Sequence, residues 1–304
     1  MRRHLASAIA LALAGVSSCL AAPAATAPDA VQTTTQLPRN VRPSHYEIAV
    51  VPHASSLSFD GQATISIDVL EPTSSITLNA LDLEFTSVRL APADGKGQAS
   101  TPTVTLDAKA QTATFTFAQP LAVGRYQLAM EYTGKIGTQA SGMFAIDYEN
   151  KAGKQRALFT QFEAADARRF VPSWDEPSYK ATFDLTATVP AGQLAVSNMP
   201  VAKATNLDGG LQQVSFRTSP KMSTYLLFFG TGNLERATIN AGPTEIGVVT
   251  QSGSLAQAQF ALESSRDVLQ EYNAYFDIAY PLPKLDNIAS PGRSQFFGAM
   301  ENWG

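Results

Sequence analysis

The 304-residue sequence predicts a mainly β protein, with a large antiparallel sheet or sandwich over residues 37–240 and the start of an α-containing domain over residues 241–304. Three observations lead to this fold class. Between residues 37 and 240, short runs alternate apolar with other side chains at a period of two. Turns rich in Gly, Pro, Asn and Asp separate these runs. After residue 241 the apolar side chains follow the period of a helix.

The alternating runs are the candidate strands. In the first, Tyr46, Ile48 and Val50 lie on one face, and a turn at residues 60–61, Asp-Gly, is expected to lead into the next. The further runs that we interpret as strands are 65–69, 112–117, 126–132, 181–189 and 214–219. Turns are expected at residues 93–95 and 208–210. Strands of this length and spacing are typical of an antiparallel sheet.

One short strand, residues 245–250, precedes a single expected helix. Ser254 and Gln257 have the spacing of a capping box, so the helix is expected from Leu255 to about Phe276. The residues spaced for one helical face are Leu262, Ser265, Leu269, Tyr272 and Phe276. Pro281 and Pro283 end any continuation. So few elements cannot bury a core alone, and we expect the β domain or further sequence to cover them.

Residues 1–20 have the pattern of an export signal. Arg2 and Arg3 precede an apolar run that is too short to span a bilayer. The small residues before Cys19 resemble a bacterial lipoprotein signal, whereas ordinary cleavage among Ala21, Ala22 and Ala24 would remove Cys19, and the sequence leaves both open. We expect export to the bacterial periplasm or cell envelope, with or without a lipid anchor at Cys19, or secretion. Residues 21–36, rich in Ala, Pro and Thr, are interpreted as a flexible tether.

The composition excludes several kinds of chemistry. The net charge is −4, and no basic excess indicates nucleic acid as a partner. Cys19 is the only cysteine, so residues after it offer no thiol for a disulfide, a zinc thiolate or a nucleophile. A membrane partner is expected only through a lipid anchor at Cys19.

Charged and polar side chains are dense between residues 161 and 177, although only 16% of the chain is charged. Gln161 and Glu163 are two residues apart, which predicts that they share one face of a strand while Phe162 points to the other. By pattern alone these two are either a solvated strand face or part of a site. Arginine pairs well with carboxylates, so an ion-pair network is the favoured interpretation of four neighbours, Arg168, Arg169, Asp175 and Glu176.

Four blocks occur in a fixed order: TQFEAADARRFVPSWDEPSYKATFDL from residue 160, KMSTYLLFF from 221, YFDIAYPLPKLDNIA from 275 and GAMENWG from 298. Together they resemble the zinc-dependent aminopeptidases of the aminopeptidase N type. The resemblance covers most of the chain after the tether. It implies a β-sandwich or saddle domain at residues 37–240, followed by the truncated start of an α+β thermolysin-like catalytic domain at 241–304.

The resemblance also implies a site for peptides with a free N-terminus. An α-ammonium group carries three N–H donors, and two carboxylates and an amide oxygen suit it. By match to the family motifs, these acceptors are Glu301, Glu163 and Gln161. The backbone of Gly298 and Ala299, with Met300 in the same motif, would align the substrate as an added strand. Phe297 falls where the family lines the pocket for the first side chain, or is a plain core residue.

The sequence departs from the family at two places. Between Ile288 and Gly298 it is longer and more polar than usual, which puts first-residue specificity in doubt. The family binds zinc through H-E-x-x-H and a later Glu, but the histidines here are His4, His45 and His53, and none has an i, i+4 partner. We therefore expect zinc in the complete enzyme, no zinc ligand or catalytic residue in this chain, and structural roles for His45 and His53.

Two functional interpretations remain open. In the first, the chain is the N-terminal part of an exported zinc metallo-aminopeptidase, inactive alone, whose partner is a downstream catalytic part. In the second, it is a non-catalytic β-domain module that binds peptides or proteins. An in-frame H-E-x-x-H beyond residue 304 of the coding sequence would decide for the first.

Overall fold

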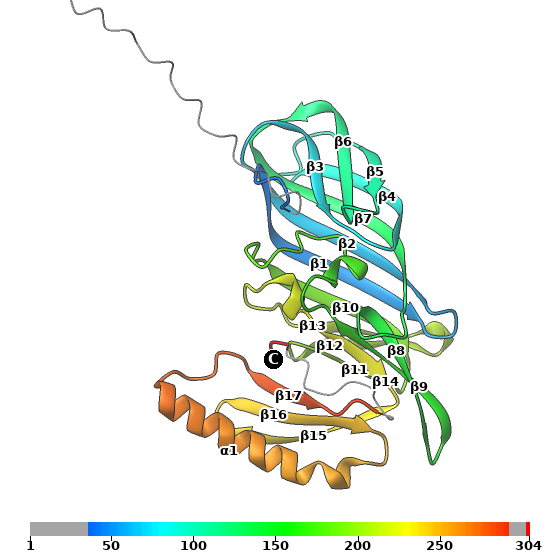
Figure 1. The fold of residues 1–304 in the computed structure, drawn as a ribbon, viewed down its shortest axis with the longest axis vertical. Helices are drawn as coiled ribbons and strands as arrows, with labels where there is room; N and C mark the ends of the chain where they lie inside the picture. Colours follow the sequence, from blue (N-terminus) through cyan, green and yellow to red (C-terminus); the bar gives the residue numbers. More distant parts are fainter. Residues whose placement is uncertain (1–35, 292–301) are drawn as a thin grey trace, which may run out of the picture. The chain divides into compact units, whose positions relative to one another are not determined.

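A computed structural model describes residues 36–291 and 302–304 (Figure 1). The chain divides into two compact units, residues 1–36 and 37–304, and the fold below is that of the second. The expected export signal, Cys19 and nearly all of the expected tether lie outside the described residues. No helix in the described ranges is long and apolar enough to cross a membrane.

A seven-stranded sheet forms the largest part of the fold. Its strands, in spatial order, are β12 (Val201–Leu207), β13 (Leu211–Phe216), β10 (Thr182–Pro190), β1 (Val41–His53), β2 (Ser58–Val69), β7 (Gly124–Lys135) and β4 (Leu83–Pro92). All neighbours pair antiparallel except β1 and β10. The period-two pattern places Ile48, Ile65 and Leu128 on the buried face.

A smaller sheet packs on the buried face of the large one. Its strands, in spatial order, are β3 (Thr73–Asn79), β6 (Thr112–Leu121) and β5 (Thr103–Asp107). The rings of Phe85 on β4 and Phe115 on β6 meet edge to face, with centroids 5.6 Å apart. Residues of both sheets belong to one continuous core, so this part of the fold is a β-sandwich.

Two further sheets complete the unit. One contains β11 (Leu194–Ser197), β14 (Phe229–Gly232), β9 (Gly153–Gln161) and β8 (Gly142–Asn150), and is called sheet C below. The other contains β15 (Leu234–Ala241), β16 (Thr244–Gln251) and β17 (Lys284–Ile288). The helix α1 (Gln259–Phe276) lies along β15 and β16 (Figure 1). Its buried Leu262 and Leu269 join a small core with Ile246 and Val248.

The predicted fold class is confirmed, and most expected strands are present. The expected turn at residues 60–61 is wrong, because Gly61 lies inside β2 and the chain turns at residues 54–57. Gly61 is needed for a different reason: a Cβ there would lie 2.4 Å from the Tyr132 ring on the neighbouring strand. The expected strand at 214–219 ends at Phe216.

The expected capping box is also wrong. The α-helix begins at Gln259, after a 3-10 turn at Leu255–Gln257, and no Ser254 side-chain cap is present. Instead, Glu235 Oε1 on β15 accepts hydrogen bonds from the backbone N–H groups of Gly253, Ser254 and Leu255, at 2.8, 2.9 and 2.9 Å. A carboxylate in front of a helix is also stabilised by the positive end of the helix dipole.

The predicted helical face is only partly buried. Leu262 and Leu269 are covered, whereas Tyr272 and Phe276 are about 60% exposed (59% and 61%). The sheet of β15, β16 and β17 covers only the first part of the helix face that the sequence predicts to be buried. The predicted domain boundary near Ala241 falls at the turn between β15 and β16, which pair along their whole length. That boundary stays a prediction.

Candidate functional site

Gln161 is the last residue of β9, at the end of sheet C. It pairs across the ladder with Gly142 on β8 and is 8% exposed. Its side-chain oxygen is buried and has no hydrogen-bond partner in the part of the chain that the structure describes. A buried acceptor without a partner costs about 1–3 kcal/mol. A ligand that donates a hydrogen bond there would remove that cost.

Glu163 lies beyond the end of the strand, which corrects the expected placement. Gln161 and Phe162 are both buried, so the alternation of faces does not continue to Glu163. Phe162 packs on Phe170, with ring centroids 5.3 Å apart, and its carbonyl accepts the N–H of Asp166 as the chain turns. Glu163 is exposed at this turn. Two of the three predicted acceptors, Gln161 and Glu163, are therefore neighbours at one strand end, one buried and one open to solvent.

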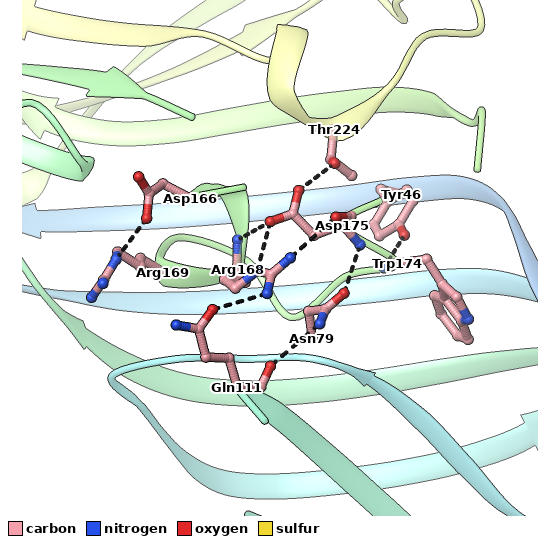
Figure 2. Close-up of polar contacts among 9 residues, drawn as sticks. All are labelled: Tyr46, Asn79, Gln111, Asp166, Arg168, Arg169, Trp174, Asp175 and Thr224. Atoms are coloured by element: carbon pink, nitrogen blue, oxygen red, sulfur yellow. Dashed lines mark hydrogen bonds and ion pairs between the residues drawn. The ribbon is translucent and has the colours of Figure 1, made fainter. Parts of the chain in front are cut away.

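One pair of the predicted ion-pair network, Arg168 with Asp175, is confirmed in the segment that follows (Figure 2). Arg168 Nε donates to Asp175 Oδ2 at 2.9 Å, and the Asp175 side chain is only 1% exposed. Asp175 Oδ1 accepts from the Thr224 hydroxyl at 2.7 Å, and Arg168 also donates to the Gln111 side chain at 2.9 Å. This network fixes the chain just after Glu163 to two distant segments, at Gln111 and at Thr224.

The other two members of the predicted network have separate partners. Arg169 pairs with Asp166 at 2.8 Å and with Asp82. Glu176 accepts from the backbone N–H of Leu37 at 2.5 Å and from Arg39 at 3.2 Å. Neither Gln111, Asp82 nor Arg39 was expected from the sequence, because the strand pairing that brings them close is not visible in local patterns.

The remaining predicted site residues, Phe297, Gly298, Ala299, Met300 and Glu301, lie outside the described residues. The structure describes the end of the same motif, where Trp303 packs against the main core. The buried Asn198 Nδ2 donates to the Trp303 carbonyl at 2.6 Å. Sequence reasoning missed Asn198, and no local pattern could have revealed a contact across 105 residues.

The two histidines in the described residues lie on β1, and each has a polar partner. His45 Nδ1 lies 2.7 Å from the Thr182 hydroxyl, and His53 Nε2 lies 2.9 Å from Asp60 Oδ2. No group of three or more His, Cys, Asp or Glu side chains that could hold a metal occurs within 36–291 and 302–304.

Comparison with known proteins gives two family matches. Residues 42–226 match the Peptidase M1 N-terminal domain, and residues 260–304 match the Peptidase family M1 domain.

Individual relatives agree with these matches. The chain is 42% identical over 270 residues to an aminopeptidase N of Acetobacter pasteurianus, covering 88% of this chain and 74% of that protein. It is 38% identical over 281 residues to a puromycin-sensitive aminopeptidase of Caenorhabditis elegans, covering 91% of this chain but only 29% of the relative. An aminopeptidase M1-D of Oryza sativa subsp. japonica is 37% identical over 275 residues, covering 88% of this chain and 30% of that protein.

Proposed function

The chain belongs to the M1 family of peptidases, and we propose that it supplies the amine-recognition part of an exported zinc aminopeptidase that removes N-terminal residues from peptides. The family is zinc-dependent in general. This chain spans 29% and 30% of two of its relatives, so the activity of a whole aminopeptidase is assigned to it only within this proposal.

The buried oxygen of Gln161, which has no hydrogen-bond partner among the described residues, is the observation that carries the proposal. A peptide α-ammonium offers three N–H donors and a positive charge near neutral pH. One donor would satisfy Gln161, and the exposed Glu163 carboxylate is free to turn toward the charge. Glu301 would supply a second carboxylate, by its match to the family motif. Since an acetylated N-terminus has neither the charge nor the three donors, the site would select free amines.

Hydrolysis would need a zinc site, which the family builds from H-E-x-x-H and a later Glu. The 304 residues contain three histidines and no H-E-x-x-H sequence, so we derive no bond-breaking step for this chain. In the proposed enzyme, the residues described here bind and orient the substrate amine.

Export and anchoring belong to the same proposal. The two arginines and the apolar run at the start of the sequence support export to the periplasm or cell envelope. A lipid anchor would be attached at Cys19.

A second function has one observation in its favour. The absence of H-E-x-x-H from these 304 residues also suits a β-domain module that binds peptide N-termini or a partner protein without cleaving them. Both functions use the same amine site, and an in-frame H-E-x-x-H in the coding sequence beyond residue 304 would separate them.

The side-chain amide of Gln161 gives a direct test. NMR signals of this amide should shift when dialanine is titrated into the protein, and should stay in place with N-acetyl-dialanine. The signals of this amide are those that disappear from the spectrum of the Gln161→Glu variant. A signal that responds to neither dipeptide, or equally to both, would overturn the proposed amine site.

A further inference from the structure

Asn198 is a fully engaged buried amide. It follows β11 directly and is 3% exposed. Its Nδ2 donates to the carbonyls of Leu226 and Trp303, at 2.7 and 2.6 Å, and its Oδ1 accepts from the N–H of Phe228 at 2.8 Å. One side chain therefore joins the loop before β14 to the segment at residues 302–304.

Residues 302–304 have two further contacts, one with Asn198 and one with the main core. A Cβ on Gly304 would lie 2.1 Å from the Asn198 carbonyl oxygen, and Gly304 has a φ of +120°, so only glycine fits there. The Trp303 ring packs against the main core. By contrast, Asn302 Oδ1 is buried without a partner among the described residues. The segment is thus held by its backbone and the Trp303 ring, not by the Asn302 amide.

The strand register places Asn198 and Gln161 at the same end of sheet C. Ser197 on β11 pairs with Phe229 on β14. On the other side, the Thr160 hydroxyl on β9 accepts from the Phe229 N–H at 2.8 Å. Asn198 follows Ser197 and Gln161 follows Thr160, so both leave the sheet in the same direction with only β14 between them. Two strand spacings separate their backbones by about 10 Å.

We propose that Asn198 is a positioning residue for the amine site. It holds Trp303 and Gly304, the end of the motif that contains Glu301, at the end of sheet C that carries Gln161. Glu301 directly precedes Asn302 in the sequence, so release of this anchor would free the carboxylate that the family motif assigns to the substrate amine. This inference rests on the proposed function of Gln161 and Glu163.

Two variants separate the anchor from the rest of the fold. Gly304→Ala adds one methyl group against the Asn198 carbonyl and leaves the bonds from Asn198 to Leu226 and Phe228 in place. Asn198→Asp removes the Nδ2 donor but keeps an acceptor for Phe228. Asn206→Asp, on the exposed edge strand β12, is the matched control for the change of an amide to a carboxylate.

The two tryptophans of the chain report the result. In the NMR spectrum of indole N–H groups, the Trp303 signal should move toward its unfolded position in both anchor variants. The signal of Trp174, which is 0% exposed, should stay fixed because the core is intact. The affinity for dialanine should fall about tenfold in both variants, the loss expected for one hydrogen bond to a charged group. Asn206→Asp should match the wild type in all three measurements.

Two results would overturn the proposal. One is a Trp303 signal that stays in place in Gly304→Ala, since the anchor would then not hold the segment. The other is a displaced Trp303 with unchanged dialanine affinity, since the segment would then not serve the site. A wild-type protein that binds dialanine and N-acetyl-dialanine equally would refute the proposed function instead, while the Trp303 signal still shows whether Asn198 holds the segment.

Discussion

Arg168 and Asp175 form a buried ion pair, with 2.9 Å between Arg168 Nε and Asp175 Oδ2, beside the strand end that carries Gln161. The two side chains are 12% and 1% exposed. The Asp175 carboxylate is also bonded to Thr224, and its backbone N–H donates to Asn79 at 3.2 Å. Because every polar atom of this carboxylate is matched, removal of one partner leaves a charge without compensation.

Asp175→Ala should therefore destabilise the protein strongly. Loss of one partner of a buried ion pair costs about 3–5 kcal/mol. The control is Asp68→Ala, which breaks the exposed pair with Arg42, 3.2 Å apart, and should cost less than about 1 kcal/mol. Urea unfolding measures both changes. Equal losses for the two variants would show that the buried network contributes no more than a surface pair.

Glu235 should stabilise the turn that leads into α1, whereas the Ser254 side chain should not. Glu235→Ala removes the acceptor of three backbone N–H groups and should lower the free energy of unfolding by about 1–2 kcal/mol. Ser254→Ala should change it by less than about 0.5 kcal/mol, the range of an ordinary surface substitution. Thermal unfolding followed by circular dichroism compares the two. A larger loss for Ser254→Ala would restore the capping box that the sequence predicts.

Tyr132 should make the protein sensitive to alkali. Burial raises the pKa of Tyr132 above its usual value. Above about pH 10 the unfolded chain loses this proton while the folded protein keeps it, so stability falls as pH rises, by about 1.4 kcal/mol per pH unit. Tyr132→Phe should make that slope less steep, because one fewer hydroxyl group releases its proton when the chain unfolds. Burial shifts the pKa of Tyr46 in the same direction, so part of the slope remains.

Urea unfolding at several pH values from 7 to 11 measures this effect. At pH 7 the hydroxyl is protonated in both states, so the wild type and Tyr132→Phe should differ there only by a constant offset. An identical alkaline slope in the two proteins would contradict the assignment to Tyr132.

The 304-residue protein should not hydrolyse peptides. Incubated with zinc and an aminoacyl chromogenic substrate, it should release no more product than buffer does, because the sequence contains no H-E-x-x-H. Hydrolysis that a chelator abolishes would contradict this prediction. Such a result would also exclude the non-catalytic module.

Local patterns predict much of this fold, because a half-buried strand has a two-residue repeat that appears directly in the sequence. The alternation of Tyr46, Ile48 and Val50 on β1 is an example. Gly61 shows the limit: Asp-Gly is a strong turn signal, yet the close approach of the Tyr132 ring gives this glycine a place inside a strand. That contact depends on a strand more than sixty residues away.

The candidate site was only partly predictable for the same reason. The resemblance to the family motif points to Gln161 and Glu163. The two-residue repeat does not place Glu163 correctly, because β9 ends at Gln161. Glu235, which holds the turn before the helix, and Asn198, which anchors Trp303, act across 20 and 105 residues. Such contacts follow from sheet register, which a single sequence does not display.

Selectivity for a free amine tests the central claim most directly. Isothermal titration with dialanine and with N-acetyl-dialanine gives the affinity ratio for the wild type, for Glu163→Gln and for the control Glu149→Gln on β8. The wild type and the control should prefer the free amine by about tenfold or more, and Glu163→Gln should lose most of that preference, as expected for one partner of a charged hydrogen bond. An affinity ratio that is the same in all three proteins would contradict the assignment of Glu163 to the substrate amine.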